Sequence, residues 1–364
     1  MARPAVPVTF VIGRTEVATG PTGHLGTYRA LDGSDGADLR VDIDGPHAML
    51  VVGKRGYGKS YTLGVLAEEL ARTRGTTPVV VDPMGAFRTL AAGAVDGTAP
   101  VPATVVQEPV VSASALDPRS WCDLLRLPPE SGPGGLVWQA AAESETLGAM
   151  REHVAASDAP GADVRAAGNH LSLAASWGVF DPAGLSAADL ETPGITVLDV
   201  SGLDDAPMNA VVRAVAGGLY RARVADRAER FPWLLVDEAH AFFDGVAGGA
   251  LETVLRRGRA PGVSLIAATQ RPSAVPEVAV SQADIVVAHR LTAQSDIDAL
   301  ERAQPSYASV PLADRMPTAP GEVVIVDDAT ETVNAARVRR RHTPHGGDDP
   351  SLSDPPVPDT TAPE

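Results

Sequence analysis

Lysine is almost absent from this 364-residue chain. Lys54 and Lys59 are its only lysines, although the chain has 30 basic residues in all. Acidic residues number 46, so the formal net charge is -16. Carboxylates at this density repel one another unless salt screens them. The composition therefore predicts a halophilic protein adapted to a salt-rich cell interior, and a GC-rich genome, which also favours Ala, Gly and Arg, is the alternative explanation.

Other absences narrow the class of protein. The single cysteine, Cys122, excludes an intramolecular disulfide and a zinc site built from thiolates. No apolar run approaches the roughly 20 residues of a membrane-spanning helix, and residues 1–20 lack the pattern of a secretory signal. We therefore expect a cytoplasmic protein without membrane contact. Its length suits two domains or one enlarged α/β domain.

Both lysines lie in one short segment. Residues 53–60 read GKRGYGKS and match the phosphate-loop pattern G-x-x-x-x-G-K-[ST] at every fixed position. An apolar run at 47–52 predicts a strand before the loop, and the amphipathic pattern of 61–70 predicts a helix after it. Because this context is the one in which the pattern binds nucleoside triphosphates, we count Tyr61 among the expected nucleotide-binding residues.

The fixed positions of the loop have expected roles. Gly53, Gly56 and Gly58 let the backbone curl so that successive N–H groups and the helix N-terminus face the β-phosphate. The Lys59 ammonium is expected to reach the β- and γ-phosphates, and the Ser60 hydroxyl to bind Mg²⁺.

An acidic pair follows a second apolar run. The run at 232–237 predicts a buried strand that ends in Asp237, and Glu238 comes next. Open parallel sheets bind ligands at the carboxyl ends of their strands. We therefore expect Asp237 to hold the water shell of the metal and Glu238 to activate the attacking water as general base. Gln270, after the predicted strand 262–268, is expected to sense the γ-phosphate or orient the water.

Three classes of nucleotide-binding protein are excluded by the same sequence. A guanine-specific NKxD loop needs a lysine outside the phosphate loop, and there is none. The segment 201–205 does not resemble the LSGGQ signature of ABC-transporter ATPases. Residues 237–240 spell DEAH, but the downstream strand carries TQRP at 269–272 in place of the Ser-Ala-Thr of DEAH-box helicases. His240 is expected to make local packing or hydrogen-bonding contacts, and a contact near the γ-phosphate is the alternative.

Five segments together resemble the HerA branch of the HerA/FtsK superfamily of ring-forming DNA motors. They are 53–70, 79–87, 234–243, 256–276 and 337–347. The resemblance implies a RecA-like fold, ATP and Mg²⁺ as cofactors, a homohexamer and movement along double-stranded DNA. It also implies a nuclease partner in DNA end processing, as many relatives have. Full-length relatives carry a sizeable β-barrel before the motor domain, and the short segment 1–46 departs from that pattern, which weakens the case for nuclease docking.

The resemblance implies an arginine finger in addition to the residues already named. Arg256 is the first candidate and Arg259 the second. Both lie near the end of a helix predicted at 251–259, where cations also favour the helix dipole. An electrostatic cap is therefore the alternative interpretation of these arginines.

The fold class expected from these patterns is α/β, a RecA-like P-loop NTPase with a mainly parallel central sheet. We expect a small β extension at 1–46, the ATPase domain at 47–341 with a helical insertion at about 100–190, and an arm with a disordered tail at 342–364. The arginine run at 337–341 is expected to be a solvated strand end or a subunit contact rather than a DNA contact. The predicted strands are 47–52, 78–82, 194–200, 232–237, 262–268, 284–288, 321–326 and 333–339.

The function predicted from the sequence is that of a Mg-ATP-dependent, DNA-translocating ATPase or helicase of HerA type, acting in DNA end processing, repair or defence. A genome-packaging or conjugative DNA pump of a mobile element is one alternative. A slow ATP-dependent switch subunit of a defence or regulatory complex is another, from a different class. Glu238 and Gln270 favour turnover over binding alone.

The charge balance leads to a prediction about stability. The thermal unfolding temperature should be lower in 0.01 M than in 1 M KCl, because the Debye length falls from about 30 Å to about 3 Å between them. Thermal denaturation followed by circular dichroism measures it. An unchanged midpoint across this range would favour the genome-composition explanation.

Overall fold

The computed structural model describes residues 10–14, 20–30, 32–95, 97–302 and 310–346. The strands are β1 Phe10–Ile12, β2 Thr22–Arg29, β3 Asp35–Asp42, β4 Ala48–Val52, β5 Thr76–Asp82, β6 Ala103–Gln107, β7 Ile195–Asp199, β8 Phe231–Val236, β9 Ser264–Thr269, β10 Ile285–Ala288, β11 Glu322–Asp327 and β12 Thr332–Val338. The α-helices are α1 Lys59–Arg72, α2 Pro118–Leu124, α3 Gly132–Glu143, α4 Leu147–Ala155, α5 Gly161–Ser176, α6 Ala187–Leu190, α7 Asp205–Val224, α8 His240–Phe243, α9 Gly248–Arg257, α10 Glu277–Ser281 and α11 Gln294–Arg302. None of the described helices is long and apolar enough to cross a membrane. The predicted tail from residue 347 onward lies outside the described residues.

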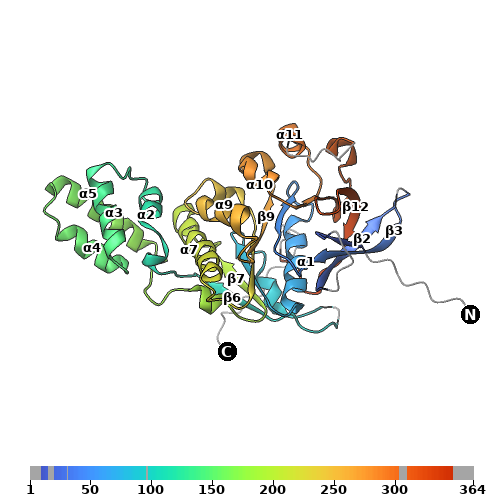
Figure 1. The fold of residues 1–364 in the computed structure, drawn as a ribbon, viewed down its shortest axis with the longest axis horizontal. Coiled ribbons are helices and arrows are strands. Elements are labelled where there is room, and N and C mark those ends of the chain that lie inside the picture. Colours follow the sequence, from blue (N-terminus) through green and yellow to red (C-terminus); the bar gives the residue numbers. More distant parts are fainter. Residues whose placement is uncertain (1–9, 15–19, 31, 96, 303–309, 347–364) are drawn as a thin grey trace, which may run out of the picture.

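One sheet organises the molecule, in the order β1-β3-β2-β12-β11-β10-β4-β9-β8-β5-β7-β6 (Figure 1). The seven strands from β10 to β6 are parallel to one another, and β11, β12, β2 and β3 continue the sheet from β10 in antiparallel pairs. All eight strands predicted from the sequence are present, with ends that differ by at most two residues. The run of short apolar segments separated by helical patterns was therefore a sound guide to the central sheet.

The two edges of the sheet differ from the sequence prediction. At one edge, β2 pairs with β12, so the amino-terminal strands continue the central sheet. At the other edge, β6 pairs with β7 in a stretch where we expected helices. The sequence ATVVQ of β6 is short, and its side chains are half-buried or exposed, as on an edge strand. Such a segment has too few apolar residues to produce a periodic pattern.

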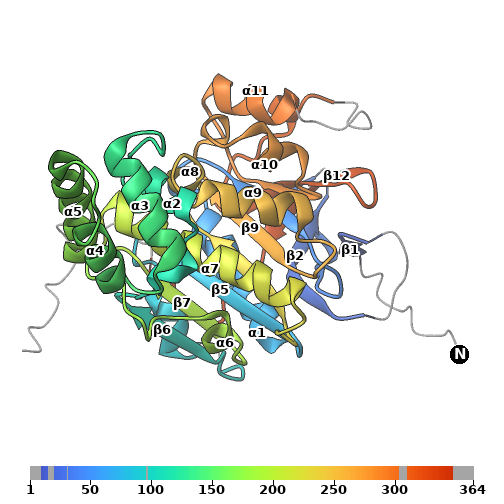
Figure 2. The same ribbon diagram turned by 60° about the vertical axis from the view of Figure 1, so that its left-hand side comes forward.

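Helices α2 to α5 form a bundle at one end of the sheet (Figures 1 and 2). Three of them begin at a residue whose side-chain oxygen accepts a hydrogen bond from the backbone N–H three residues on. These residues are Asp117 before α2, Ser131 before α3 and Thr146 before α4. A capped first turn satisfies backbone donors that have no partner within the helix, which explains where these helices start.

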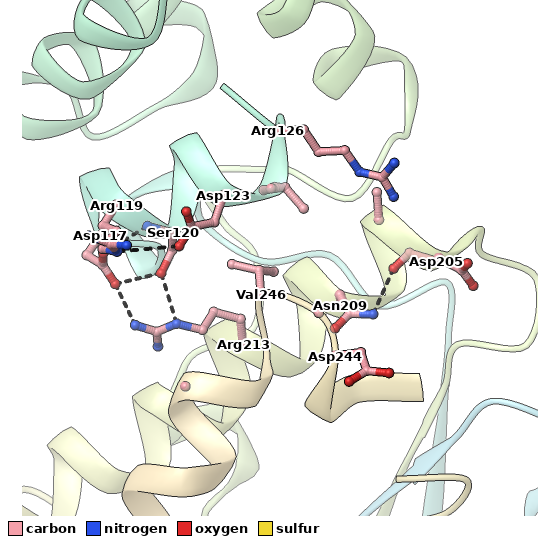
Figure 3. Close-up of a pocket in the computed structure, with 14 residues that line it drawn as sticks. Asp117, Arg119, Ser120, Asp123, Arg126, Asp205, Asn209, Arg213, Asp244 and Val246 are labelled. Carbon is pink, nitrogen blue, oxygen red and sulfur yellow. Dashed lines mark hydrogen bonds and ion pairs between the residues drawn. The ribbon is translucent and has the colours of Figure 1, made fainter. Parts of the chain in front are cut away.

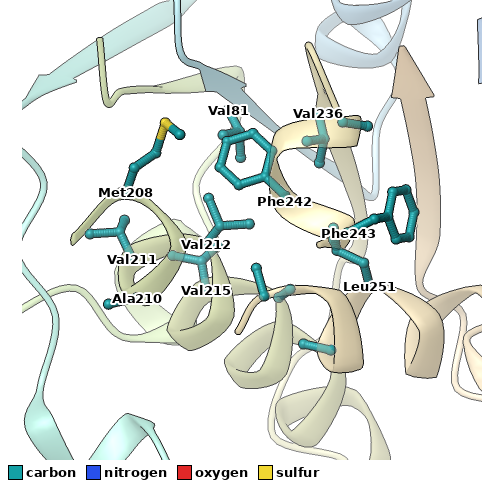
Figure 4. Packing of buried hydrophobic residues seen from close by; sticks show 14 of the residues in the cluster. Val81, Met208, Ala210, Val211, Val212, Val215, Val236, Phe242, Phe243 and Leu251 are labelled. Atoms are coloured by element: carbon teal, nitrogen blue, oxygen red, sulfur yellow. The ribbon is translucent and has the colours of Figure 1, made fainter. Parts of the chain in front are cut away.

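Successive side chains of the strands point to opposite faces of the sheet, and they pack into two hydrophobic cores, one on each face. Leu50 and Val52 of β4 point to the face covered by α7 and α9, whereas Met49 and Val51 point to the face covered by α1. Figure 4 shows the first core, where α7 packs on Val81 of β5 and on α8. Burial on both faces explains why the central strands read as continuous apolar runs.

A buried carboxylate joins α1 to the carboxyl-terminal segment. Glu68 is fully buried, and it accepts hydrogen bonds from the backbone N–H groups of His342 and Thr343, from the Thr343 hydroxyl and from Arg339. Burial alone would raise the pKa of Glu68, but the hydrogen bonds from Thr343 and His342 lower it below its usual value. The carboxylate is therefore held in its charged form.

The arginine run at 337–341 is only partly solvated, contrary to our expectation. Arg339 also contacts Glu69 at 2.8 Å and donates to the backbone of β2, and the side chain of Arg341 is 1% exposed against α1. Arg337 and Arg340 remain exposed. The two carboxylates of α1 need counter-charges once they are buried, and the alternate arginines of the run supply them within the same chain.

A second buried ionic cluster links β3, β4 and β10. His47 lies between Asp284, at 2.8 Å, and Asp42, at 3.3 Å, and Asp42 also contacts Arg14. Burial alone would lower the pKa of His47, but the hydrogen bonds and charges of Asp284 and Asp42 raise it to about 9. Burial alone would raise the pKa of Asp42, but hydrogen bonds from His47 and Arg14 lower it to about 2.

These shifts predict how stability depends on pH. His47 has a folded-state pKa of about 9, above its unfolded value of about 6.5, so its contribution is complete below pH 6.5 and is lost as the pH rises to 9. His47→Gln should lower the free energy of unfolding at pH 6 by at most about 3 kcal/mol. It should also flatten the decline between pH 6.5 and 9. Urea unfolding at several pH values measures both effects, and an equal slope in the two proteins would contradict the assignment.

Candidate functional site

Three parallel strands bring the predicted site residues to one edge of the sheet. The pairing of β4 with β9 sets Val52 opposite Thr269, and the pairing of β9 with β8 continues this register. Gly53, Asp237 and Gln270 each come directly after one of these three strands. The carboxyl edge of the sheet therefore carries the phosphate loop, the acidic pair and the predicted sensor.

The phosphate loop has the backbone that its glycines allow. Gly56 and Gly58 have φ values of 80° and 109°, in a region that L side chains rarely adopt. Gly58 is the N-cap of α1, and Lys59 is its first residue. The loop therefore ends at a helix N-terminus, a favourable position for an anion.

Lys59, Ser60 and Asp237 lie together beneath this loop. The Ser60 hydroxyl donates a hydrogen bond to Asp237 Oδ2 at 2.7 Å. Asp237 is 1% exposed, and burial raises its pKa, while the hydrogen bond from Ser60 opposes that shift. Lys59 is 6% exposed, and burial lowers its pKa, against the opposing charges of Glu238 and Asp237.

Glu238 has an unusual backbone. Its φ is 46°, in the left-handed region that non-glycine residues rarely occupy. Burial raises the pKa of its carboxyl, and the charge of Lys59 opposes the shift. Its Oε2 atom is buried and makes no hydrogen bond within the part of the chain that the structure describes. The His240 Nδ1 atom lies 3.4 Å from it, and burial lowers the pKa of His240, which favours the neutral imidazole.

Sequence analysis overlooked His289. This fully buried residue follows β10, and its Nε2 lies 2.9 Å from the Thr62 hydroxyl of α1. A Cβ atom added at Gly53 or Gly58 would come within 2.5 Å or 3.1 Å of its side chain. Burial and the charge of Lys59 lower its pKa to about 4, so the imidazole is neutral beneath the loop. A polar residue directly after the apolar run at 285–288 was the available indication in the sequence.

Three predicted site residues have other surroundings. Tyr61 accepts a hydrogen bond from the backbone N–H of Arg341 at 2.7 Å, and its ring contacts His345. Arg256 and Arg259 lie at the end of α9 and beyond it, next to the amino edge of the sheet, where β9 begins. Both side chains are exposed, and Arg256 lies 3.6 Å from Glu252. The structure therefore does not bring these arginines to the phosphate loop of their own chain.

A cavity of about 570 Å³ lies between α2, α7 and the loop that joins α8 to α9 (Figure 3). Its charged lining residues include Asp117, Arg119, Arg126, Asp205, Arg213 and Asp244. Arg213 contacts Asp117 at 2.5 Å and donates to Ser120 at 3.0 Å. The cavity is therefore the junction between the helical bundle and the sheet domain, and it does not include the phosphate loop.

A comparison with family models identifies part of the chain. Residues 24–133 match the family described as Helicase HerA, central domain. The match confirms the resemblance to HerA. It contains the phosphate loop and α1 but ends before β8, so the HerA assignment of the acidic pair rests on its position beside Ser60.

Solved structures share the fold over most of the chain. VirB4 of Thermoanaerobacter pseudethanolicus superposes with a TM-score of 0.68 at 18% identity, over 90% of this chain and 98% of that one. Plasmid coupling protein TrwB in complex with ADP and Mg²⁺ gives 0.61 at 13%, over 92% and 98%. An unbound form of TrwB, described as a bacterial conjugative coupling protein, gives 0.57 at 14%, over the same shares. These matches confirm the predicted α/β fold class. A search of curated protein sequences finds no match.

Proposed function

We propose that this HerA-like protein is a Mg-ATP-dependent ATPase that moves double-stranded DNA. The observation that carries the proposal is the contact of Ser60 with Asp237 beside the buried Lys59. This contact joins the first turn of the phosphate-loop helix to the acidic pair. Glu238 follows Asp237 directly and supplies a carboxylate near the same point, so the site has groups for binding phosphate and for activating water.

The residues present fit a magnesium ion that arrives with the nucleotide. Within the described residues, no group of three or more His, Cys, Asp or Glu side chains is arranged to hold a metal ion. Mg²⁺ commonly takes only one or two protein oxygens, with phosphates and water completing its shell. The Ser60 hydroxyl and the Asp237 carboxylate are two such oxygens. When bound, the ion would neutralise charge on the phosphates.

Three other side chains would bind the phosphates, accept a proton and orient the water. Lys59 would hold the β- and γ-phosphates, aided by the N–H groups of the loop. Glu238 would accept a proton from the attacking water, and burial raises its pKa toward the range that suits a general base. Gln270, at the end of β9, would orient that water or sense the γ-phosphate.

The first test is ATP hydrolysis with and without linear duplex DNA, in molar and in low KCl. Hydrolysis should be stimulated strongly by DNA and should fall by about 10² or more in Glu238→Gln. That variant should still bind ATP, whereas Lys59→Ala should lose productive binding. Normal hydrolysis by folded Glu238→Gln would show that another group activates the water. Indifference of the wild type to DNA would favour the slow switch.

Arg256 generates a prediction about assembly. We propose a homohexamer in which Arg256, or Arg259 in second place, reaches the nucleotide of a neighbouring subunit. An exposed guanidinium at the far edge of the sheet is available for this, and its planar donors suit a phosphate. Arg256→Ala and Lys59→Ala should each be nearly inactive, and mixing them should restore some hydrolysis.

The control for the mixing experiment is subunit exchange, followed with differently labelled subunits. If exchange occurs and the mixture stays inactive, Arg256 only caps its helix and Arg259 is tested next. Recovered activity that persists when both substitutions are placed in one chain would contradict the proposal.

A conjugative or packaging pump of a mobile element is the second candidate. The observation in its favour is the similarity to TrwB, which is described as a conjugative and plasmid coupling protein. In that case, the helical bundle of this chain would contact a component of the DNA-transfer machinery. In HerA-type end processing, it would contact a nuclease. Pull-down with a nuclease and with a transferred plasmid complex separates the two settings, since both use the same ATPase reaction.

A further inference from the structure

His240 links the predicted general base to the end of β9. Its Nδ1 lies 3.4 Å from Glu238 Oε2 and 3.3 Å from the Thr269 hydroxyl oxygen. Thr269 is the last residue of β9 and directly precedes Gln270. One nitrogen atom therefore lies between the side chain of the acidic pair and the strand that carries the predicted sensor.

The chemistry of the two oxygen atoms decides which tautomer of His240 can interact with the Glu238 carboxylate. An ionised carboxylate oxygen only accepts hydrogen bonds, so a close Nδ1 atom must carry a proton to be attracted to it. The Thr269 oxygen already accepts the backbone N–H of Arg271 at 3.0 Å, which fixes its position. His240 Nδ1 thus lies beside two oxygen atoms: Glu238 Oε2, a buried acceptor that makes no hydrogen bond within the described residues, and the Thr269 hydroxyl.

The backbone reinforces this link. The Ala239 N–H donates to the Ala268 carbonyl of β9 at 2.8 Å, and the Ala241 N–H donates to the Glu238 carbonyl at 2.9 Å. Glu238 is held in a left-handed conformation between these contacts. The backbone of the turn is therefore fixed to β9. The Glu238 carboxylate has a hydrogen bond from the backbone N–H of Gln270, and its Oε2 atom lies 3.4 Å from His240 Nδ1.

We propose that His240 is a positioning residue that holds the Glu238 carboxylate in place relative to the end of β9. The inference rests on the proposed function, in which Glu238 activates water and Gln270 senses the γ-phosphate. His240 does not touch the nucleotide in this proposal. It acts by limiting the orientations of the general base, because a misplaced base lowers the rate even when binding is intact.

The test uses the difference between the two nitrogens of the ring. Asparagine places its amide nitrogen near the position of Nδ1, and glutamine places its own near Nε2. His240→Gln and His240→Ala should lower kcat about tenfold, the lower end of the cost of losing a supporting partner, with KM for ATP unchanged. His240→Asn should keep most of the activity.

Thr269 provides an independent variant pair. Thr269→Val removes the hydroxyl and keeps the shape, and it should lower kcat in the same direction as His240→Ala. Thr269→Ser keeps the hydroxyl and should behave as the wild type. Thermal unfolding and binding of a fluorescent ATP analogue should be the same in the His240 variants and in Thr269→Ser, because a purely structural role would change these readouts and would not distinguish Asn from Gln. Thr269→Val also removes the acceptor of the Arg271 N–H, so a lower unfolding temperature is expected for that variant alone.

The outcomes separate this inference from the proposed function. Hydrolysis by Glu238→Gln at the wild-type rate overturns the proposed function and the inference with it. An inactive Glu238→Gln together with normal His240→Ala overturns the inference alone. Equal losses in His240→Asn and His240→Gln overturn the assignment to Nδ1. Combining His240→Ala with Glu238→Gln should cause no further loss, since His240 acts through the carboxylate.

Discussion

The pairing of β8, β9 and β4 in register is the constraint on which the site depends. All three strands end at the same edge of the sheet. Residues separated by more than 200 positions in sequence are therefore neighbours there through the backbone pairing alone. A shift of one residue in either pairing would turn every side chain of that strand to the other face. The two hydrophobic cores oppose such a shift, because each strand is apolar on both sides.

Charge is concentrated where burial makes it costly. Lys59, Asp237 and Glu238 lie in one small region. Burial lowers the pKa of Lys59 and raises the pKa values of Asp237 and Glu238, so it favours the neutral form of each group. The charge of Lys59 opposes the shifts of the two carboxyl groups and their charges oppose its own, whereas the charge of Glu238 adds to the shift of Asp237. His289, below the loop, is neutral and adds no further positive charge. Titratable groups whose pKa values are shifted by burial and by one another are typical of functional sites.

Sequence reasoning located elements of the fold where the information is local, and the chemical roles of the site residues stay predictions. The phosphate loop, the acidic pair and the central strands are each encoded in fewer than a dozen consecutive residues. It failed for contacts between residues or strands that are far apart in the sequence. Nothing in the helical pattern around Glu68 shows that it is buried or that Arg339 will pair with it, and β6 has a partner strand but no apolar periodicity of its own. The contact of His240 with Thr269 likewise depends on two strands meeting.

The hydrogen bonds of Glu68 have a consequence for the order in which parts of the chain can fold during synthesis. The groups that donate to its carboxylate come 271 to 275 residues later in the sequence. A ribosome releases α1 well before β12 and the segment after it, because chains emerge from the amino terminus onward. Until then, the phosphate-loop helix carries a carboxylate with no native partner, and β2 has no β12 to pair with. The environment of the phosphate-loop helix is therefore completed only after the segment that follows β12 has been synthesised.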